Sequence, residues 1–90
     1  MLRISPQSQA DGTTLLGLEG WLNAAEVGNL RREVESRLDQ GPIILDLDEV
    51  RSIDGAGLGL LQNWHEQGVR LKGGKLFVRA LLKSRGLAAD

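Results

Sequence analysis

The sequence contains no cysteine and no tyrosine, and its 90 positions include only two tryptophans and one phenylalanine. Without cysteine there is no disulfide framework, no thiolate chemistry and no cysteine metal site. A core with so few aromatic residues must be built mainly from Leu, Ile and Val. No apolar run approaches the roughly 20 residues of a membrane span, and the N-terminus lacks the long apolar stretch of a secretory signal. We therefore expect a soluble, cytoplasmic protein without membrane insertion.

Acidic residues are missing from the last part of the chain. No Asp or Glu lies between Glu66 and Asp90, and the basic residues there are Arg70, Lys72, Lys75, Arg79, Lys83 and Arg85. Such a segment is typical of a solvated strand and helix, or of a surface that faces an anionic partner or membrane. The solvated surface is the simpler interpretation. Nucleic acid is not expected as a partner, because the segment offers no set of base-stacking aromatic side chains.

The composition is that of an ordinary small globular domain, with 41% hydrophobic residues, 26% charged residues and a net charge of −1. We expect one domain over residues 1–90, because this length leaves no room for a second core. Hydrophobic periodicity predicts alternating strands and helices. Strands are expected at 2–5, 13–19, 43–47 and 75–79, and helices at about 24–38, 55–67 and 80–87.

The segment from Ile43 to Leu47 is almost continuously apolar, which is typical of a strand buried on both faces. The helix before it would connect it in parallel to the preceding strand through a right-handed crossover. The first strand is expected to be antiparallel to the second. Residues 48–52 are predicted to form a loop, with Val50 and Ile53 anchored in the core.

The next helix is predicted to begin after Asp54, whose carboxylate would cap the first turn. Gly57 lies on the expected inward-facing stripe, together with Leu60, Leu61 and Trp64. Leu58 lies about 100° from the centre of that stripe. It is therefore either a candidate contact for a partner or an ordinary, partly exposed leucine.

Catalytic and metal-binding groups are scarce. His65 is predicted in the middle of a helix with no nucleophile near it in sequence, so it has no evident role in proton transfer. Asp46, Asp48 and Asp54 could in principle bind a hard cation, but no further ligands accompany them. We expect neither an enzyme nor a bound metal or cofactor.

The glycines around Ala56 superficially resemble a phosphate-binding loop. A dinucleotide fingerprint would require a glycine at the position of Leu60 and a turn directly after the strand, and a P-loop would require a Lys-Ser/Thr pair. The sequence has neither. What remains is a glycine-rich helix start whose N–H groups could accept an anion or an acidic side chain.

Residues 44–61 read Ile-Leu-Asp-Leu-Asp-Glu-Val-Arg-Ser-Ile-Asp-Gly-Ala-Gly-Leu-Gly-Leu-Leu. This stretch resembles the STAS domain family of bacterial anti-sigma factor antagonists and sulfate-transporter tails. The family pattern has an apolar strand, Asp-Leu, a few polar residues, Val, and then Ile-Asp-Ser-Ser/Thr-Gly-Leu before an apolar helix. Residues 18–23 and 81–87 match two further family segments. The resemblance implies an α/β fold with a four-stranded, mostly parallel mixed sheet, an antiparallel first strand and about three helices.

In anti-sigma factor antagonists, the first Ser after the Asp of this motif is phosphorylated by a partner kinase that is also the anti-sigma factor. The matching position here is Gly55, and Ala56 follows it, so neither residue has a hydroxyl group. Ser52 lies off the family position. The resemblance therefore implies partner binding without phosphorylation at that position.

These observations together predict a non-enzymatic protein-interaction module. The expected docking surface covers residues 48–58, with Ser52, Asp54, Gly55, Ala56, Gly57 and Leu58 as contacts. The partner would be a kinase-like anti-sigma factor or a transporter ATPase subunit, and the chain would then resemble the STAS subunits of lipid-transport ABC systems. The alternative is a small-molecule or nucleotide sensor that binds an anion at the start of the second helix.

Overall fold

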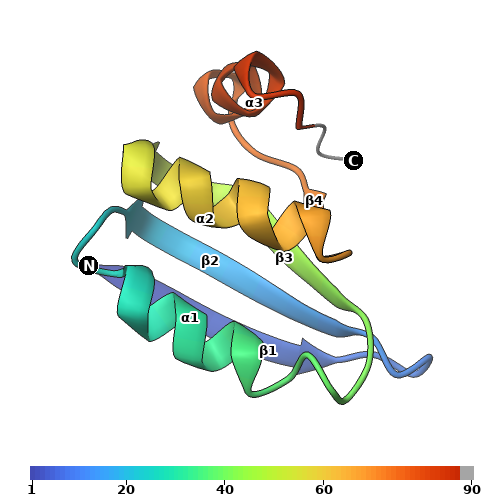
Figure 1. Cartoon of the computed structure of the whole chain (residues 1–90). Helices are drawn as coiled ribbons and strands as arrows, with labels where there is room; N and C mark the ends of the chain where they lie inside the picture. The colour runs from blue at the N-terminus through green and yellow to red at the C-terminus, as the bar shows by residue number, and fades with distance from the viewer. Residues whose placement is uncertain (88–90) are drawn as a thin grey trace.

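The computed structural model describes residues 1–87 and contains a four-stranded sheet in the order β1-β2-β3-β4 (Figure 1). β1 (Leu2–Ser8) pairs antiparallel with β2 (Thr14–Leu22), while β3 (Ile43–Ile53) and β4 (Arg70–Lys72) extend the sheet in parallel. The helices are α1 (Val27–Glu35), α2 (Gly55–Glu66) and α3 (Leu76–Ser84). The expected fold class, with its antiparallel first strand, is confirmed.

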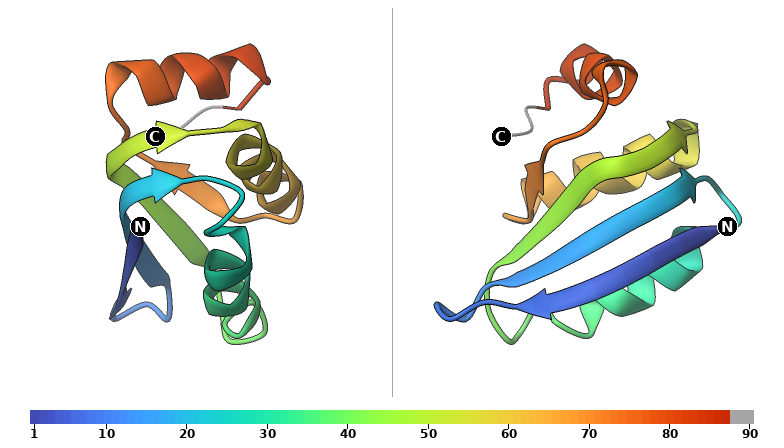
Figure 2. Two further views of the ribbon diagram at one scale, coloured as in Figure 1. Left: turned by 90° about the vertical axis from the view of Figure 1, so that its left-hand side faces the viewer. Right: turned by 180° about the vertical axis from the view of Figure 1, so that it is seen from behind.

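The helices are divided between two sides of the molecule. Figure 2 shows α1 and α2 together on one face of the sheet, whereas α3 stands apart from them and packs near β3. The opposite face of β1 and β2 carries no helix. The core beneath α1 and α2 is aliphatic, as the composition requires, with Leu16, Leu18, Leu45 and Leu47 at most 1% exposed around the single buried aromatic, Trp64.

β1 and β2 are both longer than expected. Pro6 does not end β1, because β1 is an edge strand where a missing N–H group is tolerated. Gly20 does not break β2 but adopts a φ of +112°, which a residue with a side chain rarely adopts. A Cβ atom at Gly20 would also collide with the carbonyl oxygen of Met1, so only glycine allows the strands to pass here.

The expected loop at residues 48–52 is wrong, because β3 continues to Ile53. Two register shifts in the β2–β3 pairing, one between Gly17 and Glu19 and one after Gly20, allow the pairing to continue. Val50 is fully buried, as predicted for a core anchor, and Ile53 is partly buried against the core. Ser52 therefore lies on a strand.

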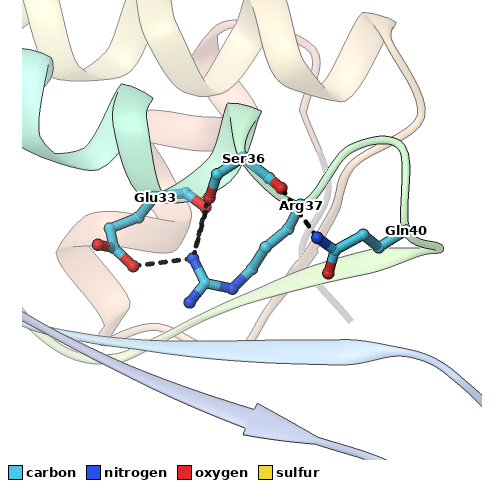
Figure 3. Close-up of polar contacts among 4 residues, drawn as sticks. All are labelled: Glu33, Ser36, Arg37 and Gln40. Atoms are coloured by element: carbon cyan, nitrogen blue, oxygen red, sulfur yellow. Dashed lines mark hydrogen bonds and ion pairs between the residues drawn. The ribbon is translucent and has the colours of Figure 1, made fainter.

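α1 is shorter than the expected helix at 24–38. Asn23 caps a turn before the helix by accepting a hydrogen bond from the N–H of Ala25, so helical structure begins only at Val27. At the other end, Arg37 Nη1 donates to the carbonyl oxygen of Glu33 at 2.7 Å and to its carboxylate at 2.8 Å, and Gln40 donates to the carbonyl of Ser36 (Figure 3). These side chains satisfy the carbonyls that the ending helix leaves free.

The C-terminal elements differ from the prediction of a strand at 75–79 and a helix at 80–87. β4 is the short segment Arg70–Lys72, and α3 takes up most of both predicted elements. Gly73 and Gly74 both have positive φ values and form the turn after the strand rather than before it. The apolar triplet at 76–78 belongs to α3, where Val78 and Leu82, one turn apart, are buried.

The substitution Trp64→Ala should lower the free energy of unfolding by about 3–5 kcal/mol, because it leaves a cavity at the centre of the core. Urea unfolding followed by circular dichroism measures this change. His65→Ala, at the exposed neighbouring position on α2, is the matched control and should unfold like the wild type. Equal stability of Trp64→Ala and His65→Ala would contradict this account of the core.

Candidate functional site

Asp54 sits between β3 and α2 and makes the hydrogen bonds that shape this edge of the sheet. Its Oδ1 accepts from the N–H of Gly57 at 2.9 Å, which is the predicted helix cap. Its Oδ2 accepts from the N–H of Ala24 at 3.0 Å, which the sequence did not predict. Its own N–H donates to the carbonyl oxygen of Leu22 at 3.1 Å. Asp54 therefore joins the start of α2 to the connection between β2 and α1.

The electrostatics of Asp54 follow from these bonds. The hydrogen bond from the N–H of Gly57, and then the one from Ala24, lower the pKa of Asp54 below its ordinary value, because both stabilise the carboxylate. Asp54 is therefore ionised at neutral pH, and both carboxylate oxygens are engaged within the protein. Its role in this structure is to position its neighbours, and it is not poised as a proton donor.

Gly57 and Leu58 are buried and do not form part of an accessible surface. A Cβ atom at Gly57 would lie 2.5 Å from the carbonyl oxygen of Leu22, so the glycine allows α2 to approach the end of β2 closely. Leu58 is 5% exposed and belongs to the core, which corrects its expected role as an apolar contact. The buried arc of α2 is wider than a single stripe, and α2 contacts both α1 and β3.

The accessible residues at this edge come from three connected segments. Asp54, Gly55 and Ala56 are exposed at the start of α2, and a Cβ atom at Gly55 would meet nothing within 4 Å. Ser52, on the last part of β3, is exposed and pairs in register with Trp21 of β2. We call this set the carboxyl-edge surface: Trp21, Ala24, Ser52, Asp54, Gly55 and Ala56.

Trp21 was missed by the sequence-based prediction of contact residues. Its side chain is 53% exposed, while Leu22 beside it is fully buried. The signal lies in the alternation of β2, where Leu16, Leu18 and Leu22 face the core and Trp21 falls out of phase with them.

The two aspartates of β3, Asp46 and Asp48, accept hydrogen bonds from backbone N–H groups. Asp48 Oδ1 accepts from the N–H of Gly74 at 2.9 Å and so holds the turn that leads into α3. Asp46 accepts from the N–H of Asp48 at 3.0 Å. In residues 1–87, no group of three or more acidic or histidine side chains is arranged to hold a metal ion. His65 is exposed on α2.

The arrangement is unfavourable for an anionic ligand. The carboxylate of Asp54 already takes the N–H of Gly57, the position at which an anion would bind the helix start. A hollow of about 210 Å³ lies on the open face of the sheet, but its lining includes Glu19, Asp46 and Glu49 and only one cation, Arg3. Both features would repel a phosphate group.

Comparison with known proteins identifies the family of this chain. The family description "Mlab, STAS domain" matches residues 5–89, which is nearly the whole chain. The chain belongs to the STAS domain family. A search of curated proteins finds no match.

Solved structures with this fold include two anti-sigma factor antagonists. The unphosphorylated form of SpoIIAA superposes with a TM-score of 0.73 at 18% identity, covering 98% of this chain and 88% of SpoIIAA. The STAS domain of an antagonist from Rhodobacter sphaeroides gives 0.63 at 15% identity, covering 82% and 86%. A protein from Shewanella loihica with a SpoIIAA-like fold gives 0.61 at 12% identity, covering 94% and 76%. At these identities the likeness establishes the fold.

Replacing Asp54 should make the stability of the fold less dependent on pH in the acidic range. Because the folded-state pKa of Asp54 is lowered, the ionised group stabilises the fold above about pH 4, and this contribution is lost as the pH falls through the folded-state pKa. Asp54→Asn should therefore melt at a lower temperature than the wild type at pH 7, and the difference should shrink below about pH 4.

Thermal melts of both proteins at pH 7 and pH 3 measure this effect. The lowered pKa of Asp11, which accepts the N–H of Thr13, is common to both proteins and cancels in the difference. Asp39→Asn, at an exposed position after α1, is the control and should melt like the wild type at both pH values. An equally large deficit of Asp54→Asn at pH 3 would argue against the role of the carboxylate.

Proposed function

We propose that this STAS domain acts by docking a protein partner on the carboxyl-edge surface. The observation that carries the proposal is the pairing of an exposed aromatic residue with an adjacent stretch of bare backbone. Trp21 is half exposed, and Gly55 and Ala56 lie at the neighbouring end of β3 with almost no side chain to keep another chain away. Tryptophan is among the residues that most often dominate binding energy at interfaces.

The hydrogen bonds of Asp54 support this function by making the surface rigid. Its carboxylate bonds fix the β2–α1 connection and the first turn of α2 relative to each other. A surface that is already ordered loses less conformational entropy when a partner binds. Gly55 then allows close approach of a partner backbone, and Trp21, which pairs in register with Ser52 near the end of β3, supplies exposed apolar area at the same edge of the sheet.

The chain would act without phosphorylation at the position of the family motif. Gly55 and Ala56 occupy the places where anti-sigma factor antagonists carry hydroxyl groups, and neither can accept a phosphate. Phosphorylation there would add about −1.5 to −2 units of charge beside Asp54. Phosphorylation at that position would therefore not regulate docking. Any regulation of docking would act through the partner or its abundance.

The partner class follows from the two kinds of STAS protein that the chain is similar to. One is the anti-sigma factor antagonist, which would imply a kinase-like anti-sigma factor as partner. The other is the small STAS subunit of lipid-transport ABC systems, which the sequence resembles and which would imply a transporter ATPase subunit as partner. A nucleotide sensor is the weaker alternative, because Asp54 occupies the helix start where an anion would bind.

A charge and a long side chain placed on the carboxyl-edge surface should block docking. Ala56→Arg should weaken binding by at least about tenfold, because the arginine would hold the partner away from the helix start. Trp21→Ala should weaken binding by about 30-fold or more if the indole is an anchor. The measurement is calorimetric titration with purified anti-sigma factor and ATPase subunit from the same organism.

Asn63→Arg is the matched control for Ala56→Arg. It introduces the same side chain at an exposed position two turns further along α2 and should bind like the wild type. Loss of binding by all three variants would indicate general damage. Unchanged affinity of Ala56→Arg and Trp21→Ala would show that the partner docks elsewhere.

Incubation with an anti-sigma kinase and ATP should leave the chain unphosphorylated. The position that matches the family phosphosite is Gly55, and Ser52, although exposed, lies three residues before it on a strand. Intact-mass spectrometry detects any incorporated phosphate. A phosphate group that the wild type accepts and Ser52→Ala does not would show that the switch has moved to Ser52.

A further inference from the structure

The outward face of α3 exposes two large apolar side chains side by side. Leu76 is 88% exposed and Phe77 is 42% exposed, whereas Val78 and Leu82 on the opposite side of the helix are buried. In Figure 1, α3 lies at the top of the molecule, and the views in Figure 2 show no other element over it. Leu76 is therefore available to a surface outside the protein.

Positive charge surrounds these two side chains. The exposed cations on α3 and its flanking segments are Lys72, Lys75, Arg79, Lys83 and Arg85. None of these five side chains takes part in the ion pairs Arg3–Glu19 and Arg37–Glu33 within residues 1–87. The sequence has no acidic residue between Glu66 and Asp90. The nearby acidic residues come from β3, where Asp46 pairs in register with Lys72 and Asp48 accepts from the N–H of Gly74. We call this region the α3 outer face: Lys72, Lys75, Leu76, Phe77, Arg79, Lys83 and Arg85.

We propose that the α3 outer face binds the surface of an anionic lipid bilayer. A helix that presents leucine and phenylalanine among lysine and arginine has the chemistry of peripheral membrane contact. The cations would lie at the level of the acidic headgroups, while Leu76 and Phe77 would enter the boundary with the acyl chains. The site is peripheral: no helix in residues 1–87 is long and apolar enough to cross a membrane.

The distribution of charge favours a lipid surface over an acidic protein. The cations lie before α3, along it and after it, rather than in one group that a fixed set of carboxylates could pair with. Lipid headgroups move laterally and can match such a spread without a complementary shape. Leu76, with almost its whole side chain exposed, gives an apolar contribution that a purely electrostatic protein contact would not need.

Membrane contact through α3 does not depend on the proposed docking function. The ends of β2 and β3 and the start of α2 lie at the left edge of Figure 1, while α3 forms the top. A partner on the carboxyl-edge surface and a bilayer on the α3 outer face would therefore approach from different directions. The two contacts can be tested separately, because they share no residue.

Sedimentation of the full chain with extruded vesicles tests the proposal. We expect binding to vesicles of equal parts phosphatidylcholine and phosphatidylglycerol at low salt, release at high salt, and no binding to phosphatidylcholine alone. Arg79→Glu with Lys83→Glu should lower the bound fraction at least about tenfold. Leu76→Ser with Phe77→Ser should weaken binding without removing its salt dependence.

The control reverses two charges on another helix. Arg31→Glu with Arg32→Glu, at exposed positions of α1, changes the net charge by the same amount and should bind vesicles like the wild type. Circular dichroism of every variant checks the fold. The proposal is overturned if the wild type ignores both kinds of vesicle, if the α1 and α3 variants lose binding equally, or if the chain binds polyglutamate but not lipid.

Discussion

The carboxylate of Asp54 is the single group on which the arrangement of this edge depends. The sheet brings the ends of β2 and β3 together, but β2 continues toward α1 while β3 turns into α2. One backbone bond joins the two departures, from the N–H of Asp54 to the carbonyl oxygen of Leu22. The bonds from Asp54 to Gly57 and Ala24 do so across 30 residues of sequence. The close approach of Gly57 to Leu22 then fixes the distance between helix and strand.

The contacts that shape this edge of the sheet are independent of any phosphorylation. The features that shape the edge, the carboxylate of Asp54 and the close approach of Gly57 to Leu22, are structural in this chain, and neither involves a hydroxyl group. The proposed docking surface would therefore form without a phosphorylated side chain. Trp21 fits this interpretation, since an aromatic anchor supplies contact area that no covalent modification needs to create.

The sequence predicted what is encoded locally. The order of strands and helices, the cap by Asp54 and the bounds of α2 all depend on short-range patterns, and the structure confirms them. It did not predict features set by tertiary packing. Leu58 is buried although it lies off the expected stripe of α2, and residues 48–52 form a strand because bulges in β3 allow its pairing with β2 to continue. The triplet at 76–78 has the composition of a strand, but burial of Val78 and Leu82 makes it helical.

The two outer strands of the sheet also restrict how this protein can be recognised. β1 carries Pro6, which has no N–H group to offer, and β4 is only three residues long, two of which are the exposed cations Arg70 and Lys72. Neither strand gives another chain a long, regular row of backbone groups to pair with. Growth of the sheet by strand addition, whether in a complex or in an aggregate, is therefore disfavoured. A protein partner would then have to bind through side-chain contacts and turns rather than by adding a strand to the sheet.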